Sequence, residues 1–589
     1  MQSLTQKLTD IVREAFVQSG YEAEYGTIAL SNRPDLAQFQ CNGALPAAKV
    51  YGRNPREIGQ QVVEKLQSAA IFADVSLAGP GFINLTVTDA YLAEFMNAMA
   101  ADERAGIESV SQPRRVVVDY GGANVAKPMH VGHLRAGIIG ESIKRIFQFM
   151  GDDVLGDVHL GDWGTQMGQV ILEIKQRQPE LPYFDANYTG PYPEESPITL
   201  ADLEEIYPAA SKQYKSDPAY AEAARQITAE LQNGRPGYRA LWQHIHDISV
   251  AGLKVDYDNL DIHFDLWMGE SDVQNRIDPM IEKLEEEGFA VRSEGALVVD
   301  ISEEDDKKEM PPLILRKSDG GVLYGTTDLA TIDQRVQELK AELILYVVDH
   351  RQRQHFEQVF RAAYKTGVAP QSLGLEHNYF GTMNGKDGKP FKTREGGVMK
   401  LKDLIALVHE AALQRMDESH VAEEFEEAER QEVANRVGLA ALKYADLMNQ
   451  RTKDYTFDLD RFASFEGRTG PYLLYTAVRA HSILRKAAEQ SLLPGEILPP
   501  AAEAERTLLL LFAQLTDVLQ QTYETRMPNH LAEYVYNLAN EFNRFYNTCH
   551  ILREEDAAQQ ASWLGVTQLF LKIMEITLHL LGITIPERM

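Results

Sequence analysis

The segment 116–137 constrains the fold of this chain more strongly than any other stretch. The apolar residues Val116 to Val118 precede a glycine-containing turn, and apolar residues then recur at helical spacing from Leu134 to Met150. A second apolar segment follows at 153–160. A strand, a glycine turn, a helix that begins near Gly132 and a second strand make up a βαβ unit, which predicts a parallel sheet.

The same pattern returns at 321–350. Here we expect a short strand, a helix and the strongly apolar strand Leu343 to Val348. Two such units predict one doubly wound α/β domain of the Rossmann type over residues 113–403. The stretch at about 170–300 is rich in helix formers and turn residues, and we interpret it as an insertion into this domain.

Different patterns flank this central region. Residues 1–112 combine amphipathic helices with short strand-like segments such as GFINLTV, which predicts a small α+β domain. From residue 404 onward the strand signals vanish, and apolar residues at helical spacing predict an all-α bundle over 404–589. We therefore expect a multidomain protein.

Composition excludes several classes of protein. The chain has 87 acidic and 58 basic residues and a formal charge of −29, which argues against a protein that coats nucleic acid but leaves room for a local basic groove. Its two cysteines, Cys41 and Cys549, lie far apart, so neither a disulfide framework nor a cysteine-based zinc site is expected. The N-terminal residues form an amphipathic pattern rather than a secretory signal, and no apolar run approaches the roughly 20 residues that span a bilayer. We expect a soluble, cytoplasmic protein.

His130 and His133 stand at the N-terminus of the helix that follows the glycine turn. Ligands of doubly wound sheets bind beyond the carboxyl ends of the strands, and a helix N-terminus attracts anions there. Two imidazoles in the first turn could donate to phosphate oxygens and stabilise the charge that develops when pyrophosphate leaves. The alternatives are two structural histidines or a metal pair, although zinc would lack its remaining ligands. The position favours nucleotide binding.

The stretch NVAKPMHVGH resembles the HIGH signature of class I aminoacyl-tRNA synthetases. Other motifs narrow the resemblance to the arginyl-tRNA synthetase family, and they occur in the order of that family across nearly the whole chain. They are LGDWGTQMG (160–168), MGES (268–271), LYGTTDLATI (323–332), GKDGKPFKTREGG (385–397), GPYLLYTAVR (470–479) and the terminal LLGITIPERM. The resemblance implies ATP-dependent attachment of arginine to its tRNA through an arginyl-adenylate, with release of pyrophosphate and AMP.

The resemblance also implies an ATP site in the central class I catalytic domain. His130 and His133 would bind the phosphates and the transition state, and Gly132 would leave room for the adenine ring. The second class I signature is present only in the degenerate form KPFKTR, within the loop 385–397. The cations that face the triphosphate are then expected among Lys127, Lys389 and Lys392. Lys127 taken alone would be an ordinary exposed lysine, but its place in this motif favours a role at the phosphates. Mg²⁺ is expected with ATP, and no metal is expected on protein ligands.

Six residues are expected, by the same resemblance, to hold the substrate arginine. They are Asp119, Asn124, Glu270, Tyr324, Asp328 and Gln352. The chemistry agrees, because a guanidinium is a planar array of donors that cannot lose its proton, so a selective pocket needs fixed carboxylates. Asp328 lies just beyond the strand expected at 321, where it could also act as an N-terminal helix cap.

The partner implied is tRNA(Arg), bound by both flanking domains. By resemblance, the C-terminal domain binds the anticodon and the N-terminal domain binds the outer corner of the tRNA. Charge alone does not indicate this, because residues 456–589 contain 11 basic and 16 acidic side chains. Candidate base contacts are Phe82 and Asn84 in the N-terminal domain and Tyr536, Asn540 and Asn543 on a C-terminal helix. Tyr536, Asn540 and Asn543 form a polar stripe on that helix, which could instead be an ordinary solvated face.

Two other functions stay open at this point. One is a nucleotidyltransferase that shares the HIGH-type helix but uses a small acceptor, which would leave the flanking domains without a purpose. The other is a catalytically inactive relative that binds tRNA, and the presence of His130, His133, Tyr324 and Asp328 argues against it. The protein is expected to be a monomer.

Overall fold

The computed structural model describes the chain except for residues 34, 309, 319, 390–398 and 420–423. It divides into two compact units. The first comprises Met1–Ser109, Gln414–Tyr444 and Ala463–Met589, and the second comprises Val110–Leu413 and Ala445–Phe462. None of the described helices is long and apolar enough to cross a membrane.

The second unit is built on a four-stranded parallel sheet with the order β11-β10-β5-β6. Its strands are β5 (Arg115–Asp119), β6 (Asp153–Asp157), β10 (Leu343–Tyr346) and β11 (Gly374–His377). The apolar residues at the centres of β5 and β10 are fully buried, which explains their continuous run of valine, leucine and isoleucine. The register aligns Asp119 with Asp157 and Tyr346, so the carboxyl ends of the three strands meet at one edge.

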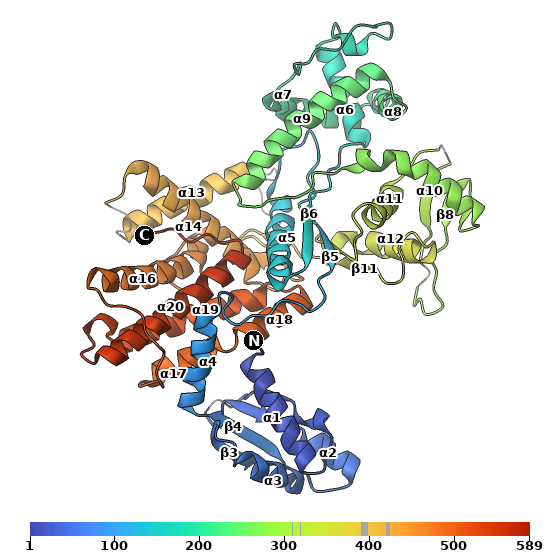
Figure 1. Cartoon of the computed structure of the whole chain (residues 1–589). Coiled ribbons are helices and arrows are strands. Elements are labelled where there is room, and N and C mark those ends of the chain that lie inside the picture. Colours follow the sequence, from blue (N-terminus) through green and yellow to red (C-terminus); the bar gives the residue numbers. More distant parts are fainter. Residues whose placement is uncertain (34, 309, 319, 390–398, 420–423) are drawn as a thin grey trace. The chain divides into compact units, whose positions relative to one another are not determined.

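The first predicted βαβ unit is confirmed. Helix α5 (Val131–Met150) connects β5 to β6 and lies against both strands (Figure 1). It begins one residue before the expected Gly132 and ends at Gly151, whose φ of 101° is the left-handed conformation that favours glycine at a helix C-terminus. The glycine turn between β5 and α5 therefore opens at the carboxyl edge of the sheet.

The short strand expected at 321–323 is wrong. Val322 forms only an isolated antiparallel bridge with Arg316 at the end of β9 (Leu313–Arg316). Strand β9 belongs to a separate antiparallel sheet with β7 (Ala290–Ser293) and β8 (Ala296–Val299). The reason is a tight turn after β9, in which Lys317 N donates to Gly321 O and Gly320 has a φ of 84°, so that few residues remain to extend a strand.

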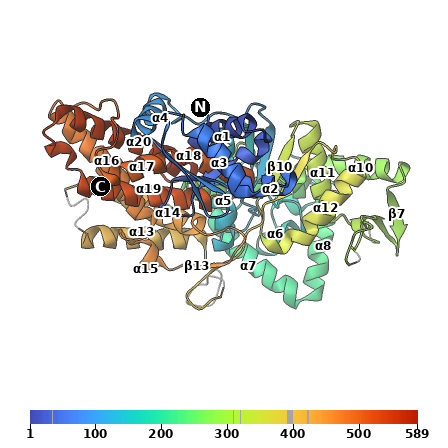
Figure 2. The same cartoon turned by 90° about the horizontal axis from the view of Figure 1, so that it is seen from below.

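The second βαβ unit lies further along the chain than predicted. It consists of β10, helix α12 (Arg353–Lys365) and β11. Helix α11 (Tyr324–Gln337) precedes it and lies beside α12 and α10 (Gln274–Glu286), as Figure 2 shows. The doubly wound α/β prediction is therefore correct, although one of its strands was assigned to the wrong segment.

The chain between β6 and β10 is largely helical, as expected of an insertion. It contains α6 (Thr165–Arg177), α7 (Leu200–Ser216), α8 (Pro218–Gln232) and α9 (Pro236–Asp258), which pack against one another. Prolines occupy the first turn of α8 and of α9, where a missing N–H has no cost. The insertion leaves the strand order of the parallel sheet intact, because β10 pairs directly with β5.

The first unit begins with the predicted α+β fold. An antiparallel sheet of order β1-β2-β4-β3 is formed by β1 (Ile28–Leu30), β2 (Phe39–Cys41), β4 (Phe82–Val87) and β3 (Phe72–Ala78). Helices α1 (Leu4–Gln18), α2 (Ala44–Tyr51), α3 (Pro55–Leu66) and α4 (Asp89–Ala101) accompany it. The GFINLTV segment forms β4, which confirms the strand expected there.

The rest of the first unit is helical. Its helices include α16 (Gly470–Glu489), α17 (Glu503–Phe512), α18 (Leu515–Thr525), α19 (Asn529–Thr548) and α20 (Ala557–Leu580). The apolar repeat of α19 is fully buried at Leu531, Val535, Leu538, Phe542 and Phe545. One detail differs from the expectation that strands vanish after residue 404, because β13 (Tyr455–Thr456) in the second unit pairs with β12 (Met383–Asn384). Two residues give too short a pattern to detect in a sequence.

Candidate active site

The carboxyl edge of the parallel sheet holds a buried charge cluster. Arg335 of α11 donates from Nη2 to Asp119 Oδ2 at 2.6 Å and to Asp157 Oδ2 at 2.7 Å. The arginine side chain is fully buried, and the two carboxylates are buried with it. Asp119, expected to hold the substrate, therefore already has an internal guanidinium as its partner. Sequence analysis missed Arg335 because it follows Asp119 by 216 positions.

Burial and charge act in opposite directions on Asp119. Burial raises the pKa of its carboxyl, and this effect outweighs the nearby positive charge of Arg335. Within the described part of the chain, Asp119, Asp157 and His159 form a group whose ligand atoms could together hold a metal ion. Arg335 already supplies the counter-charge to both carboxylates, so we assign no metal to this group.

The two signature histidines are fastened to the start of α5. His130 is the N-cap residue, and its Nδ1 accepts a hydrogen bond from Gly132 N at 3.0 Å. His133 Nδ1 accepts from His130 N at 3.2 Å, and the two rings stack with centroids 4.0 Å apart. Since each Nδ1 is an acceptor, each neutral ring carries its proton on Nε2. Both imidazoles thus offer an Nε2–H donor.

Both histidines are neutral at physiological pH. Burial lowers the pKa of His133 to about 3, and the neighbouring His130 and the positive charge of Lys127 act in the same direction. Burial also lowers the pKa of His130, again with a contribution from Lys127. The pair therefore acts through N–H donors rather than through a full positive charge, next to the positive end of the α5 dipole.

Gly132 has a steric role that the sequence did not reveal. A Cβ at this position would lie 2.7 Å from His130 Cε1, which is too close for any side chain. Glycine here therefore leaves room for the His130 ring in its capping position. This adds to the role in adenine binding that we predicted for Gly132.

The segment that follows the KMSKS-like loop is hydrogen-bonded to the signature. Val131 N donates to Met399 O at 3.1 Å, and Leu401 N donates to Met129 O at 3.0 Å. His130 and Lys400 thereby form an antiparallel bridge. The backbone that follows the KMSKS-like loop is therefore bonded to the first class I signature, which precedes it by about 270 positions in the sequence.

Tyr324 and Asp328 lie on the first two turns of α11. The N-cap residue of this helix is Leu323, so the alternative interpretation of Asp328 as the cap is wrong. Asp328 Oδ2 instead accepts a hydrogen bond from His355 Nε2 at 2.5 Å. The Tyr324 ring is 68% exposed and meets the His355 ring edge to face, with centroids 5.7 Å apart. His355 was not singled out from the sequence.

Glu270 is electrostatically coupled to Asp328. It begins the short helix η3 (Glu270–Val273), and burial raises the pKa of its carboxyl to about 7, with further increases from Asp162 and Asp328. The structure thus brings together two of the carboxylates that sequence analysis proposed for the arginine pocket. Because like charges share this site, a cationic ligand between them would be favoured.

The remaining predicted arginine ligands lie in the same unit. Asn124 forms a parallel bridge with Gly161, and a Cβ at residue 161 would lie 2.5 Å from Asn124 Oδ1. Gly161 therefore leaves the space that the asparagine side chain occupies. Gln352 is exposed at the N-cap position of α12, and its side chain makes no capping hydrogen bond.

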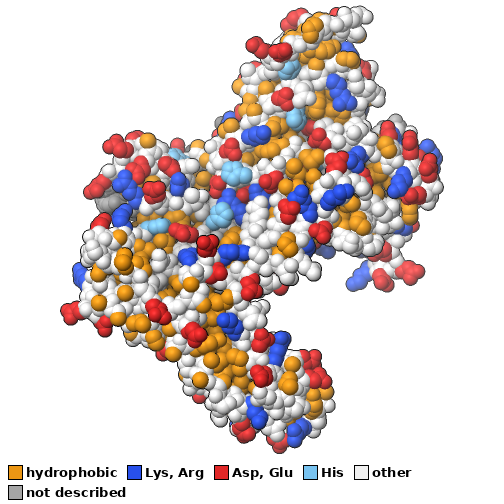
Figure 3. Space-filling view, viewed as in Figure 1, with side chains coloured by type: hydrophobic (Ala, Val, Ile, Leu, Met, Phe, Trp, Pro, Cys, Tyr) orange, Lys and Arg blue, Asp and Glu red, His pale blue; other side chains and the backbone are white. Residues whose placement is uncertain are grey.

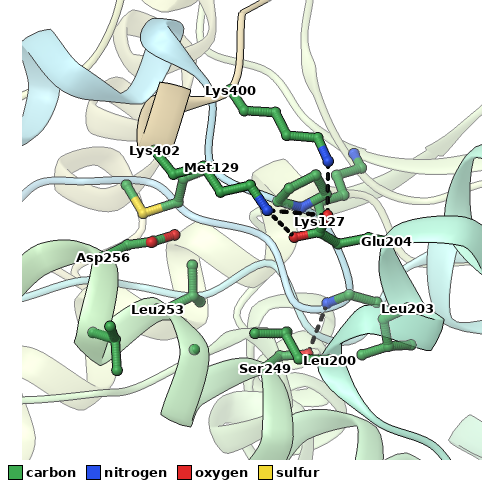
Figure 4. A pocket seen from close by; sticks show the side chains of 14 residues that line it. Lys127, Met129, Leu200, Leu203, Glu204, Ser249, Leu253, Asp256, Lys400 and Lys402 are labelled. Atoms are coloured by element: carbon green, nitrogen blue, oxygen red, sulfur yellow. Dashed lines mark hydrogen bonds and ion pairs between the residues drawn. The ribbon is translucent and has the colours of Figure 1, made fainter. Parts of the chain in front are cut away.

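Lys127 faces the insertion. Its Nζ lies 5.0 Å from the centre of the Tyr207 ring, a cation–π contact with α7. Figure 4 shows it beside Glu204, whose carboxylate is held by Lys400 at 2.7 Å and Lys402 at 2.9 Å. A cavity of about 220 Å³ is lined by the charged residues Lys127, Glu204, Lys400 and Lys402. Its apolar walls include Leu200, Leu203 and Leu253.

Only one of the two predicted loop lysines, Lys389, lies among the described residues. Lys389 is exposed, and its backbone N–H donates to Asp387 Oδ1. Lys392 lies outside the described residues. Of the two predicted cations that the structure describes, Lys127 is the one whose charge acts on both signature histidines.

Family models match nearly the whole chain. The model described as tRNA synthetases class I (R), catalytic domain matches residues 94–459. The model of the arginyl tRNA synthetase N terminal domain matches 2–87, and that of the DALR anticodon binding domain matches 473–589. The chain belongs to the arginyl-tRNA synthetase family.

Relatives and solved structures agree with this membership. The chain is 52% identical over 590 residues to the arginine–tRNA ligase of Alkaliphilus oremlandii and 49% identical over 597 residues to that of Agathobacter rectalis, with all of both chains covered in each case. The crystal structure of arginyl-tRNA synthetase from Plasmodium falciparum matches with a TM-score of 0.83 at 26% identity, covering both chains fully. The predicted class I synthetase enzyme with a helical C-terminal domain is confirmed.

The polar stripe on α19, within the DALR domain of the family, is not a solvated face. Tyr472 Oη of α16 donates to Asn540 Oδ1 at 2.7 Å, and Arg479 Nη1 donates to Asn543 Oδ1 at 2.5 Å. Tyr536 packs its ring 5.9 Å from that of Tyr472. These three predicted tRNA-binding residues therefore join α19 to α16.

An aromatic and cationic cluster beside this stripe was missed. The Arg479 guanidinium lies 4.9 Å from the Tyr475 ring centre and 5.3 Å from that of Tyr546. Both tyrosines are 38% exposed. Aromatic residues spaced at helical intervals on α16 and α19 were the available signal, but only the packing of the two helices shows that they flank one arginine.

The two candidates in the N-terminal domain of the family differ in exposure. Asn84 is only 4% exposed, and its Oδ1 accepts from Gln40 Nε2 at 2.9 Å across β2 and β4. Phe82 is half-buried at the start of β4. On the face drawn in Figure 3, basic and acidic side chains are interspersed, in keeping with the acidic composition.

Proposed function

We propose that this chain attaches L-arginine to tRNA(Arg) at the expense of ATP. The carboxylate of arginine attacks the α-phosphorus, the bond to pyrophosphate breaks, and arginyl-adenylate forms. A ribose hydroxyl at the 3′ end of the tRNA then attacks the arginyl carbonyl, and AMP leaves. The observation on which this rests is the pair of Nε2–H donors at the N-terminus of α5. The electrostatic coupling of Glu270 to Asp328 within the same unit supports it. Mg²⁺ would enter with ATP, bound to its phosphate oxygens.

The ATP site would be centred on the start of α5. His130 and His133 donate from Nε2 to phosphate oxygens, and they stabilise charge most where it increases in the transition state. Gly132 keeps the rings in place and leaves space for the nucleotide. Lys127 supplies a compact positive charge close to both histidines, while Lys389 and Lys392 would add charge from the KMSKS-like loop.

The arginine site would lie between Glu270 and Asp328. Two carboxylates match the delocalised positive charge of guanidinium, and Tyr324, Asn124 and Gln352 would add hydrogen bonds at its edges. Asp119 would contribute from its second oxygen, since Oδ2 is occupied by Arg335. A bound guanidinium would therefore balance the negative charge of these carboxylates.

The tRNA would contact the first unit. Arginine and tyrosine side chains stack on bases, so the Tyr475, Arg479 and Tyr546 cluster is suited to the bases of a single-stranded anticodon loop. Tyr536, Asn540 and Asn543 would then support this surface by holding α16 against α19. Phe82 would serve the outer corner of the tRNA by stacking, and the buried Asn84 would support this surface through its hydrogen bond with Gln40. We expect the chain to act as a cytoplasmic monomer.

Amino-acid-dependent pyrophosphate exchange tests the proposal. The chain is incubated with ATP, Mg²⁺ and each of the 20 amino acids in turn, with and without tRNA. Of the 20 amino acids, we expect only arginine to support exchange. We also expect transfer of labelled arginine to tRNA(Arg). Exchange with another amino acid would indicate a different amino-acid specificity. Binding of tRNA without any exchange would favour the inactive tRNA-binding alternative. The full-length similarity to arginine–tRNA ligases does not favour these alternatives.

A further inference from the structure

We propose that His355 is a positioning residue for arginine recognition, because it holds Asp328 and Tyr324 in the orientation that guanidinium requires. The inference rests on the proposed function and extends it to a residue that contacts the ligands of the substrate rather than the substrate itself. It concerns the start of α12, where His355 lies one turn after Gln352.

The geometry at His355 involves both predicted ligands on α11. Its Nε2 lies 2.5 Å from Asp328 Oδ2, and a carboxylate oxygen can only accept, so Nε2 carries the proton. The same imidazole meets the Tyr324 ring edge to face, with an angle of 72° between the two rings. The side chains of His355 and Asp328 are each 20% exposed, so the contact is shielded but open to a ligand. One imidazole thus contacts two side chains that are a single helical turn apart.

The bond leaves Asp328 suited to a cation. A carboxylate has about four acceptor positions, and His355 uses one of them on Oδ2, so Oδ1 and the other Oδ2 lone pair stay available for guanidinium N–H groups. An aspartate side chain in water samples several rotamers, and a ligand that selects one of them loses affinity. Because His355 already selects one orientation, arginine binds without ordering Asp328, as outer hydrogen-bond partners do for metal ligands.

The packing of α12 does not depend on His355. The buried side of this helix is formed by Phe356, Val359, Ala362 and Ala363. The His355 ring adds an edge-to-face contact with Phe356 at 5.2 Å. Replacing the imidazole should therefore change the arginine pocket more than the fold.

Three variants of the full chain separate positioning from packing. His355→Ala removes the donor and the ring. His355→Phe keeps the ring contacts with Tyr324 and Phe356 but removes the donor, and His355→Gln restores an N–H donor at a similar reach. A matched control is Gln358→Ala, which removes a hydrogen bond from α12 to Pro311 O at 2.8 Å, one turn from His355.

The readouts are KM for arginine, KM for ATP and kcat in pyrophosphate exchange with tRNA present, together with the melting temperature. We expect His355→Ala and His355→Phe to raise KM for arginine at least about tenfold, which corresponds to about 1.4 kcal/mol. KM for ATP should stay within about twofold, His355→Gln should recover most of the loss, and Gln358→Ala should resemble the wild type.

Three results would overturn the inference. An unchanged KM for arginine in His355→Phe would show that the bond to Asp328 has no role in recognition. Equal increases in both KM values together with a lower melting temperature would show a structural role. Absence of arginine-dependent exchange in the wild-type chain would overturn the proposed function itself and this inference with it, and that result is visible before any variant is made.

Discussion

The signature histidines and the arginine pocket differ in how their residues are separated along the chain. His130 and His133 lie in one helical turn, and each is held by a backbone N–H within that turn. The pocket draws Glu270 from η3, Asp328 from α11 and His355 from α12, and its neighbour Asp119 comes from β5. A local site needs only a formed helix, whereas a dispersed site needs the correct packing of several elements.

The two sites also differ in charge. The histidines are neutral donors next to a helix N-terminus, which suits phosphate oxygens that already bear negative charge. The pocket contains the partly buried carboxylates of Glu270 and Asp328, which repel one another, and this suits a cation. Perturbing one site should therefore change the kinetics of one substrate and leave the other nearly unaffected.

The largest effect is expected for Asp328→Asn, which tests whether the pocket depends on its charge. The change keeps the shape and removes the negative charge that faces guanidinium, and leaving a desolvated ion without its partner typically costs about 3 to 5 kcal/mol. This free energy corresponds to an affinity for arginine that is at least about a hundredfold lower, while the affinity for ATP is preserved. Equilibrium binding of both ligands is the measurement, and an equal loss for both would contradict a specific role in the pocket.

His133→Ala should give the next largest effect and tests the other side of the comparison. Loss of a donor that stabilises the developing charge costs about 2 to 4 kcal/mol in the rate of adenylate formation. The affinity for arginine should barely move. Single-turnover pyrophosphate exchange measures the rate, and an unchanged rate would remove His133 from the transition state.

A pH profile should separate the two sites without any mutation. Burial raises the pKa of Glu270 to about 7, and a bound guanidinium would favour its ionised form. Below pH 7 the carboxyl is protonated and must lose its proton for arginine to bind, so the affinity for arginine should fall by about tenfold per pH unit on the acid side and level off on the alkaline side. Calorimetric titration of the wild type from pH 5.5 to 8.5 measures this.

Glu270→Gln is the control for this profile. This variant should bind arginine weakly at every pH. Its affinity for arginine should no longer fall as the pH drops below 7. The histidines should not add to the slope near pH 7, because burial lowers the pKa of both, that of His133 to about 3. A slope that persists in Glu270→Gln would point to another titrating group in the pocket.

The smallest effect concerns which lysine faces the triphosphate. We predict that Lys127→Ala slows adenylate formation more than Lys389→Ala does, because the Lys127 charge already acts on both histidines whereas Lys389 is exposed. Binding of tRNA should change by no more than about a factor of three, since one cation among many phosphate contacts contributes little. Single-turnover exchange and tRNA filter binding test both statements. A near-normal Lys127→Ala beside a severely slowed Lys389→Ala would return the role to the loop.

Some elements could be predicted from the sequence because their signals are short-range. The buried strand β5, the glycine turn and the start of α5 within one residue all follow from apolar runs and helical spacing in about 35 consecutive residues. The pair of histidines in the first turn followed for the same reason. The error at 321–323 arose where a turn and an isolated bridge imitate the end of a strand.

The sequence by itself determined which chemical groups this protein has and which of them share a helical turn, so it was sufficient to propose nucleotide binding at His130 and His133. Only the tertiary structure decided that Arg335 neutralises Asp119, that Asp328 is bonded to His355 rather than capping α11, and that Asn543 holds α16. The physical reason is that a buried polar group needs a hydrogen-bond partner, and the packing of the fold decides which residue that partner is. Partners that lie 27 to 216 positions apart in the sequence produce no periodic pattern from which the pairing could be predicted. The paired charges and hydrogen bonds that define the arginine pocket therefore come from the fold.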